Sequence, residues 1–257
     1  MMSEVIRMSE YKFTKRGREC GYMRISDSTE DAGRAELYFY GDICGESWQS
    51  VWFEEDKAPQ DVADFLHALD GKKRVDVYIN SGGGDVFGGM AIYNILSRYQ
   101  GETVAHIDGI AASIAGIIPF ACDKVVAKSS AQIMLHKPWS MCVGNADDMK
   151  KCIESLNVCE QSIIDIYSAH TVNGTTPEKI KSMIDRETWL TCGQAAQYFD
   201  IEIEQGEPAA ACLSDYYDKY HNLPSGIVNK EDPVGNRKRK LQLELDCIKL
   251  QNKKRGK

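Results

Sequence analysis

No stretch of the 257-residue sequence is long and apolar enough to cross a bilayer. The most apolar run, Ile110–Cys122, contains Ser113, Gly116 and Pro119 and has thirteen residues. A helix across a hydrocarbon core of about 30 Å needs roughly 20. The N-terminal residues also lack the apolar core of a secretory signal. We therefore expect a cytoplasmic protein that has no membrane partner.

Paired cysteine motifs are missing as well. The nine cysteines are scattered from Cys20 to Cys247, their number is odd, and none of them forms a C-x-x-C pair. Disulfide frameworks usually have an even number of cysteines, and structural zinc sites usually contain C-x-x-C pairs. The pattern indicates free thiols in a reducing compartment and gives no reason to expect a bound metal, so we interpret the cysteines as small hydrophobic residues.

The loops that bind nucleotide phosphates are also absent. A glycine-rich loop, Asn80–Asp85, follows a predicted strand, but no lysine closes it as in a P-loop. A dinucleotide loop would need a glycine where Phe87 stands and an acid about 20 positions on, near Thr103–Ile107, where there is none. Both phosphate-binding interpretations therefore fail. What remains is a set of exposed backbone N–H groups, which suit a tight turn or an oxyanion hole.

Acidic side chains outnumber basic ones outside the C-terminal end. Residues 237–257 hold nine basic and two acidic side chains, a charge of +7, so a total of −7 leaves −14 on the rest of the chain. Such an acidic body disfavours nucleic acid as a partner, and only the tail has the charge for it. The hydrophobic content of 43% is typical of a globular protein with a full core.

Strand and helix patterns alternate, which predicts an α/β fold with a mostly parallel sheet. We expect strands over residues 35–41, 74–80, 103–107, 124–127, 132–135 and 201–203. We expect helices over residues 60–69, 90–99, 112–121, 145–169, 177–184 and 191–198.

Three regions follow from this pattern. Residues 1–34 are predicted to be a flexible lead-in with one short strand, and residues 35–205 to be the main domain. Residues 206–257 are predicted to be an extension. Its first part is weakly structured and holds a cluster of three tyrosines, and its basic tail has apolar spacing that suits a helix.

Ser113 lies among very small residues, in the sequence D-G-I-A-A-S-I-A-G, where a strand passes into a helix. Small neighbours let a substrate carbonyl reach the serine Oγ, and the N–H of Ile114 is suitably placed to stabilise an oxyanion. The arrangement follows the logic of a nucleophile elbow, with A-x-S-x-A in place of G-x-S-x-G. The alternative is a helix N-cap serine, which this motif taken alone favours.

His136 and a pair of acids complete the set of candidates. His136 ends a short apolar strand in the sequence M-L-H-K-P-W, a position where α/β proteins place reactive groups, although a structural role is equally compatible. Asp185 and Glu187 precede a tryptophan in D-R-E-T-W-L-T, where an acid could orient a histidine or simply be solvated.

Taken together, these motifs resemble the Clp protease proteolytic subunit, ClpP, and most of all the ClpP-like head maturation proteases of phages and prophages. The resemblance rests on the order N-S-x-G-G, G-x-A-A-S-x-A, M-L-H-x-P and an acid before W-L-T, and it covers residues 35–204. It implies a ClpP/crotonase-like α/β fold, a layered repeat of β-β-α units with a protruding long helix, here residues 145–169.

The resemblance also implies the roles of a Ser-His-acid serine peptidase. Ser113 would be the nucleophile, His136 the general base, and the backbone N–H groups of Gly83 and Ile114 the oxyanion hole. Glu187 stands where the family has an aspartate, with Asp185 as the alternative acid. Gly82 stands where the family usually has a proline. The segments after Gly84 and around residues 138–139 would hold an extended peptide by strand addition.

The resemblance implies a homo-oligomeric assembly, either a single ring or stacked rings, that encloses the active sites and acts on polypeptides. The expected partners are other copies of the chain, together with phage capsid or scaffold proteins or an AAA+ unfoldase. Two alternatives use the same fold: a crotonase-like acyl-CoA enzyme, and a non-catalytic assembly protein that has lost the chemistry. Neither metal nor cofactor is implied.

Overall fold

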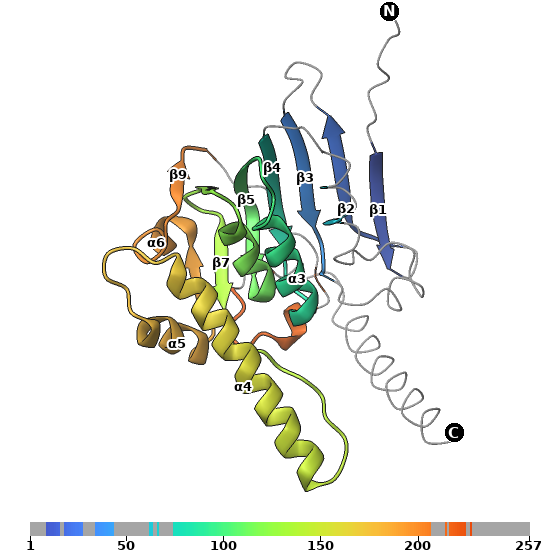
Figure 1. Ribbon diagram of the computed structural model, residues 1–257, viewed down its shortest axis with the longest axis vertical. Helices are drawn as coiled ribbons and strands as arrows, with labels where there is room; N and C mark the ends of the chain where they lie inside the picture. The colour runs from blue at the N-terminus through green and yellow to red at the C-terminus, as the bar shows by residue number, and fades with distance from the viewer. Residues whose placement is uncertain are drawn as a thin grey trace, which may run out of the picture. The chain divides into compact units, whose positions relative to one another are not determined.

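A computed structural model gives the fold of the chain (Figure 1). It describes residues 9–15, 18–27, 34–43, 62, 63, 66, 74–206, 214, 216–224 and 227. The chain divides into two compact units, Met1–Asn222 and Leu223–Lys257, and every described strand and helix belongs to the first unit. Of the helix expected over residues 60–69, only residues 62, 63 and 66 lie within the described part, and they are helical.

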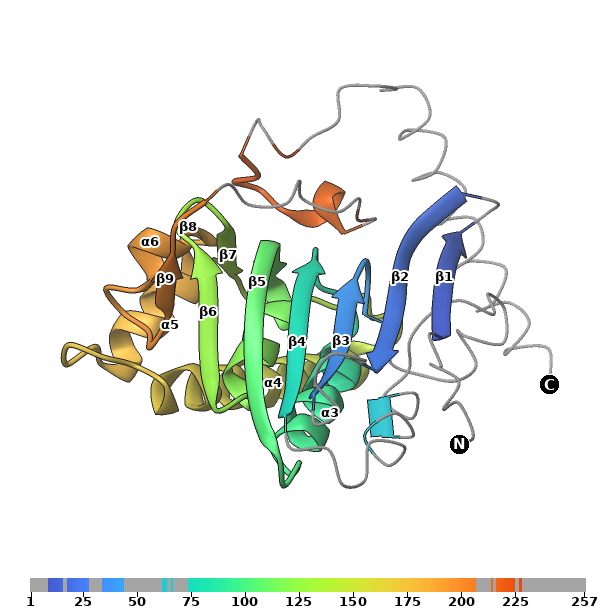
Figure 2. The ribbon, with the colours of Figure 1, turned by 90° about the horizontal axis from the view of Figure 1, so that it is seen from above.

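The described strands form one nine-stranded sheet in the order β1-β2-β3-β4-β5-β6-β9, with β7 paired to β5 and β8 (Figure 2). Pairing is parallel from β3 to β9, which confirms the predicted α/β fold. The strands are β1 (Ser9–Lys15), β2 (Arg18–Asp27), β3 (Arg34–Tyr40), β4 (Arg74–Ser81), β5 (Glu102–Ala112), β6 (Lys124–Lys128), β7 (Gln132–Leu135), β8 (Thr188–Thr191) and β9 (Glu202–Glu204).

Helices cover the sheet and fill the space beside it. They are α3 (Val86–Leu96), the 3₁₀ helix η1 (Ser113–Ala121), α4 (Ala146–Ala169), α5 (Pro177–Asp185), α6 (Cys192–Ala195) and the short 3₁₀ helix η2 (Tyr217–Lys219). Among these described helices, none combines the length and the apolar character that a membrane span requires.

The core lies between the central strands and the helices. The side chains of Val75, Val77 and Ile79 on β4 are fully buried, as expected for a parallel strand at the centre of a sheet. Phe120 of η1 packs against Tyr167 of α4, with ring centroids 5.7 Å apart, and this contact joins the two helices. All residues of η1 after Ser113 are buried, so the core positions the helix that Ser113 begins.

Helix α4 begins and ends close to its predicted limits because its cap is encoded locally. The side chain of Asn145 accepts hydrogen bonds from the N–H groups of Asp147 and Asp148, and Asp148 returns a bond to the Asn145 N–H, which makes a capping box. Figure 1 shows the N-terminal half of α4 running past the end of the sheet, and Met149 and Ile153 in this half are exposed.

Helix α3 begins earlier than residue 90, where the sequence pattern placed it. Asp85 caps the helix by accepting a 2.6 Å bond from the Gly88 N–H, so Gly88 and Gly89 lie inside the first turns. A Cβ on Gly89 would lie 2.3 Å from Cγ1 of Ile114. Glycine is thus present to bring α3 close to η1, and its low helix propensity misled the prediction.

Two further elements differ from the sequence expectation. The lead-in contains two antiparallel strands, β1 and β2, instead of one short strand. Residues 188–191 form β8, antiparallel to β7, ahead of a helix that is only four residues long. The predicted helix over 191–198 begins correctly, because Thr191 caps α6, but it is shorter than expected.

Candidate active site

Sheet pairing brings Ser113 and His136 together. The second half of β5 pairs in parallel with β7, and Ala112 stands opposite Met134. Ser113 follows the end of β5 and His136 follows the end of β7, so both side chains leave the sheet at the same edge. Ser113 Oγ lies 2.6 Å from His136 Nε2, which is a hydrogen bond.

The alternative role of Ser113 as a helix cap does not agree with the structure. The cap residue of η1 is Ala112, and no side chain caps the helix. Ser113 is instead the first residue of η1 and has a positive φ of 56°, a conformation that is costly for a residue with a side chain. This backbone turns the hydroxyl toward His136, as a nucleophile elbow does.

His136 is held as a neutral imidazole. Burial is the main cause that lowers its pKa; Glu187 raises the pKa, His221 lowers it, and the net result is a pKa of about 4. A neutral ring with its proton on Nδ1 leaves Nε2 free to accept the Ser113 hydroxyl proton. The pair therefore has the protonation state that nucleophile activation requires at neutral pH.

The two candidate acids lie in different surroundings. Asp185 is partly exposed and forms ion pairs with Lys137 at 2.9 Å and Lys181 at 3.1 Å. Glu187 is only 9% exposed and has a positive φ of 49°. Of the two carboxylates, Glu187 is the one whose charge raises the pKa of His136. Within the described part of the chain, however, no hydrogen bond joins His136 to either carboxylate.

Glu187 binds four N–H donors instead. Its oxygens accept bonds from the backbone N–H groups of His221 at 2.8 Å and Asn222 at 2.6 Å, from His221 Nδ1 at 3.0 Å, and from Trp189 Nε1 at 3.5 Å. Burial raises the pKa of Glu187, but these donors outweigh it and lower the pKa below its usual value. The carboxylate is therefore ionised at neutral pH.

Gly83 lies directly beside Ser113. A Cβ on Gly83 would lie 2.7 Å from Ser113 Cβ and 2.9 Å from the Ala112 carbonyl oxygen, and φ at Gly83 is +103°. Only glycine is compatible with both restrictions. The Gly83 N–H donates to Ser81 Oγ at 3.2 Å, while its carbonyl accepts from the N–H of Ile43 at 2.8 Å. Ile114, the other predicted oxyanion residue, follows Ser113 in η1 and is buried.

Sequence reasoning missed a segment that lies over the site. Residues 216–222 were expected to belong to a weakly structured extension, yet the ring of Tyr220 lies 5.0 Å from that of His136 and 5.8 Å from that of Trp189. The Tyr220 hydroxyl donates to the carbonyl oxygen of Gly82. The one available signal was the tyrosine cluster followed by a histidine, in a stretch otherwise rich in loop residues.

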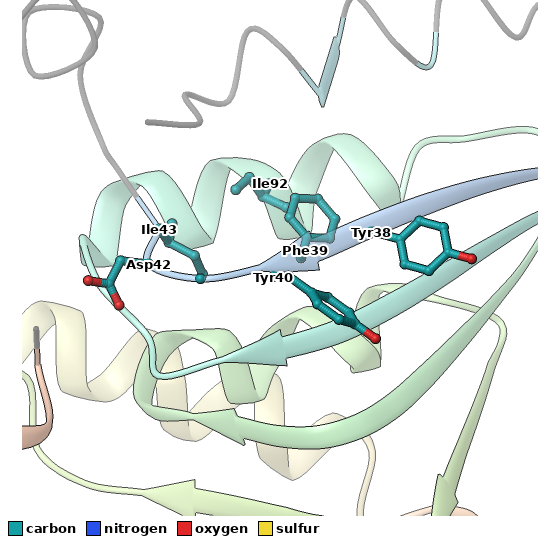
Figure 3. Close-up of a pocket in the computed structure, with 7 residues that line it drawn as sticks. Tyr38, Phe39, Tyr40, Asp42, Ile43 and Ile92 are labelled. Carbon is teal, nitrogen blue, oxygen red and sulfur yellow. The ribbon is translucent and has the colours of Figure 1, made fainter. Parts of the chain in front are cut away.

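A shallow hollow lies at the end of β3 and is lined by residues 38–43 and Ile92 (Figure 3). It contains none of the predicted catalytic residues. The Tyr40 hydroxyl donates to Asp108 at 2.5 Å beside it. The hollow is therefore separate from the Ser113–His136 pair.

Comparisons with known proteins agree with the geometry. Residues 54–200 match the family model described as Clp protease. The chain is 28% identical over 140 residues to the ATP-dependent Clp protease proteolytic subunit of Bacteroides fragilis, with 54% of this chain and 67% of that protein covered. It is 33% identical over 135 residues to the ATP-dependent Clp protease proteolytic subunit 1 of Streptomyces coelicolor, with 52% of this chain and 61% of that protein covered. The chain thus matches roughly two thirds of the length of these relatives.

Proposed function

The chain belongs to the Clp protease family, and from this premise we propose that it is a serine endopeptidase that hydrolyses peptide bonds in polypeptides. The observation that carries the proposal is the 2.6 Å contact between Ser113 Oγ and the Nε2 of a neutral His136. A crotonase-like acyl-CoA enzyme needs no such pair, and an assembly protein without chemistry has no use for a serine held at positive φ.

In the proposed reaction, His136 Nε2 takes the proton of Ser113 as Oγ attacks the scissile carbonyl carbon. The resulting oxyanion would be stabilised by the backbone N–H groups of Gly83 and Ile114. His136 then gives its proton to the leaving amine, and an acyl-enzyme forms on Ser113. A water molecule that His136 deprotonates hydrolyses this ester and restores the serine.

We assign the third role to Glu187 and not to Asp185. Glu187 is ionised, nearly buried and close enough to raise the pKa of His136, so it can stabilise the imidazolium that forms during attack. Asp185 is occupied by Lys137 and Lys181 at the surface. The Glu187 carboxylate must exchange its present donors before it can accept a bond from His136 Nδ1.

Assembly into a homo-oligomeric ring is the second part of the proposal. The loop before α4, its N-terminal half and the middle of the helix expose large apolar side chains, namely Trp139, Met141, Val143, Met149, Ile153 and Val158. An apolar surface of this kind suits contact with another copy of the chain. The C-terminal half of α4 is different, because Ile163 and Ile164 pack into the core of their own subunit.

The substrate class follows from the resemblance to phage proteases and from the names of the relatives. We propose that the protein acts in the cytoplasm, on capsid or scaffold proteins during head maturation. The alternative is unfolded polypeptide delivered by an AAA+ unfoldase, since the related subunits carry the description ATP-dependent. Purified capsid, scaffold and unfolded proteins, each offered with and without an unfoldase, separate the two settings.

Labelling with a fluorophosphonate probe tests the chemistry. We expect mass spectrometry of the full-length protein to find the label on Ser113, and Ser113→Ala to lose both the label and peptide hydrolysis. Ser97→Ala is the matched control, because Ser97 Oγ only donates to the Tyr93 carbonyl at the end of α3. Binding of acyl-CoA without labelling would favour the crotonase-like alternative, and neither activity would favour the assembly protein.

A further inference from the structure

The part of the chain that follows the protease core closes the active site. We propose that Ser214 and Tyr216–Asn222, here called the strap, form an autoinhibitory element, so that the chain is a latent protease in the structure described. The inference rests on the proposed function and adds its regulation. Figure 2 shows the strap, coloured orange-red, crossing the ends of β3 and β4.

The strap is anchored on both sides of the site. On one side, Ser214 Oγ donates to Asp42 Oδ1 at 2.6 Å, just beyond the end of β3. On the other side, Asn222 Nδ2 donates to the carbonyl oxygens of Arg186 at 2.9 Å and Glu187 at 3.2 Å. These attachments bridge strands on opposite sides of the Ser113–His136 pair, so a substrate must displace the strap to reach the serine.

The first effect of the strap is on the acid. Three of the four N–H donors on the Glu187 carboxylate come from His221 and Asn222, which are strap residues. A carboxylate offers about four acceptor positions. While the strap is in place, Glu187 is therefore held by other donors, and it makes no hydrogen bond to His136 in the described part of the chain.

The second effect is on the space where a peptide would bind. Tyr220 is 8% exposed, its ring packs edge-on against His136, and its hydroxyl donates to the Gly82 carbonyl. The same hydroxyl lies 3.2 Å from the position of a Cβ on Gly83, beside Ser113. A substrate that lay over Gly83, beside Ser113, would collide with this phenol.

Gly82 provides an independent argument. A Cβ at this position would lie 2.4 Å from Cβ and Oγ of Ser214 and 3.1 Å from the ring of Tyr217. Gly82 stands where the resemblance to ClpP leads us to expect proline. The strap therefore fits only because position 82 has glycine and not the larger proline. This difference from the family is thus explained by the contact with the strap.

Two variants release the strap from opposite sides. Tyr220→Ala removes the phenol from the site, and Gly82→Ala pushes Ser214 away from the loop without backbone strain, because φ at Gly82 is not positive. We expect both to raise the rates of fluorophosphonate labelling and peptide hydrolysis about 10- to 100-fold, the effect of removing a closed state favoured by that factor. Asp218→Ala, an exposed strap residue, is the control and should match the wild type.

Hydrogen exchange provides a readout that does not depend on catalysis. The His221 and Asn222 amides should be protected in the wild type and lose protection in Gly82→Ala, since the strap no longer holds them on Glu187. Unprotected amides in the wild type would overturn the strap. Suppose that activity is unchanged or lower in both variants while the wild type is labelled at Ser113. The proposal of autoinhibition would then be wrong, and the proposed peptidase function would still hold. If no variant labels at Ser113, the proposed function fails and inhibition fails with it.

Discussion

Glu187 and His221 are joined twice, through the backbone N–H of His221 at 2.8 Å and through its ring Nδ1 at 3.0 Å. Both bonds end on the same carboxylate oxygen, Oε2. A candidate catalytic acid is thus bound by a residue from the extension and not by the candidate catalytic histidine. In this state Ser113 and His136 are hydrogen-bonded to each other, whereas the Glu187 carboxylate is bound to His221 and Asn222.

The choice between the two acids can be tested in the Tyr220→Ala background, where Glu187 is expected to be available. We expect Glu187→Gln to lower kcat/KM by about 10²- to 10⁴-fold, because the imidazolium that forms on His136 loses its negative partner. Asp185→Asn should change it by less than about threefold, since Asp185 only pairs with surface lysines, a weak interaction. The reverse order of effects would assign the acid to Asp185.

The pH dependence of kcat/KM should show whether Tyr220 buries the His136 ring and so lowers its pKa. The base must be neutral, and burial lowers the His136 pKa to about 4, so activity of the strapped wild type should fall only as the pH approaches 4. Removing the Tyr220 ring admits water and should move this acidic limb upward, toward the ordinary value of about 6.5. Profiles of the two proteins that coincide would contradict the account of burial.

The same shift predicts how stability changes with pH. Between about pH 6.5 and pH 4 the unfolded chain binds a proton at His136 that the folded chain excludes. Stability therefore rises with pH through this window and is lost as the pH falls from 6.5 toward 4. Denaturant titrations of wild type and His136→Gln across this range measure the difference, and the variant should lose that part of the slope.

A buried aspartate at the N-terminal ends of the central strands should contribute strongly to stability. Asp76 is fully buried and binds Arg34 at 2.6 Å, Arg74 at 2.8 Å and His106 Nε2 at 2.9 Å. We expect Asp76→Asn to destabilise the fold by about 2–4 kcal/mol, because Arg34 and Arg74 lose the negative charge that they bind. Solvent screens part of this effect at the two partly exposed arginines. Thermal unfolding of Glu102→Gln, which removes only a 3.8 Å surface pair, is the control.

The contribution of Asp76 to stability should decrease at acidic pH. Burial raises its pKa, but hydrogen bonds from His106 and Arg74 and the charge of Arg34 outweigh burial and lower it. Its stabilising effect is therefore present at pH values above the ordinary aspartate range and is lost as the pH falls below it. The difference in Tm between wild type and Asp76→Asn should shrink on acidification, and a constant difference would contradict this explanation.

Close packing of α3 on η1 gives a further prediction. Gly89→Ala places a Cβ 2.3 Å from Ile114 Cγ1, so one of the two helices must move. We expect a loss of about 1–3 kcal/mol in unfolding free energy, as for overpacked cores. Because Ile114 follows Ser113, fluorophosphonate labelling should slow as well. Unchanged stability together with unchanged labelling would show that the contact is easily relieved.

The parts of the fold that the sequence predicted well are those whose signals are local. Helix α4 follows from the Asn145 cap and its periodicity, and α5 from Thr176 and the proline at its first position. The Ser113 and His136 motifs could be found because each is a strand followed by a distinctive residue. Their mutual contact required the parallel pairing of β5 with β7, which no local pattern encodes.

The features that were missed depend on contacts distant in sequence. Tyr220 lies 138 residues from Gly82, and its burial comes from ring contacts with His136 and Trp189 and not from any periodic pattern. Helix α3 begins early, and its first turns contain Gly89, a residue type that local propensity assigns to loops. Only the close contact with Ile114 explains why glycine stands there. Tertiary packing decided these positions against local propensity.

The attachment of Ser214 to Asp42 and of Asn222 to Glu187 has a kinetic consequence. The strap and the active site that it covers belong to one polypeptide. Closure is therefore a first-order process, and dilution of the protein does not reverse it. A peptide that competes for the groove faces a tethered rival at an effective concentration on the order of millimolar. Polypeptides at low concentration should therefore not be cleaved. Only substrates present at a high local concentration should compete with the strap and be hydrolysed.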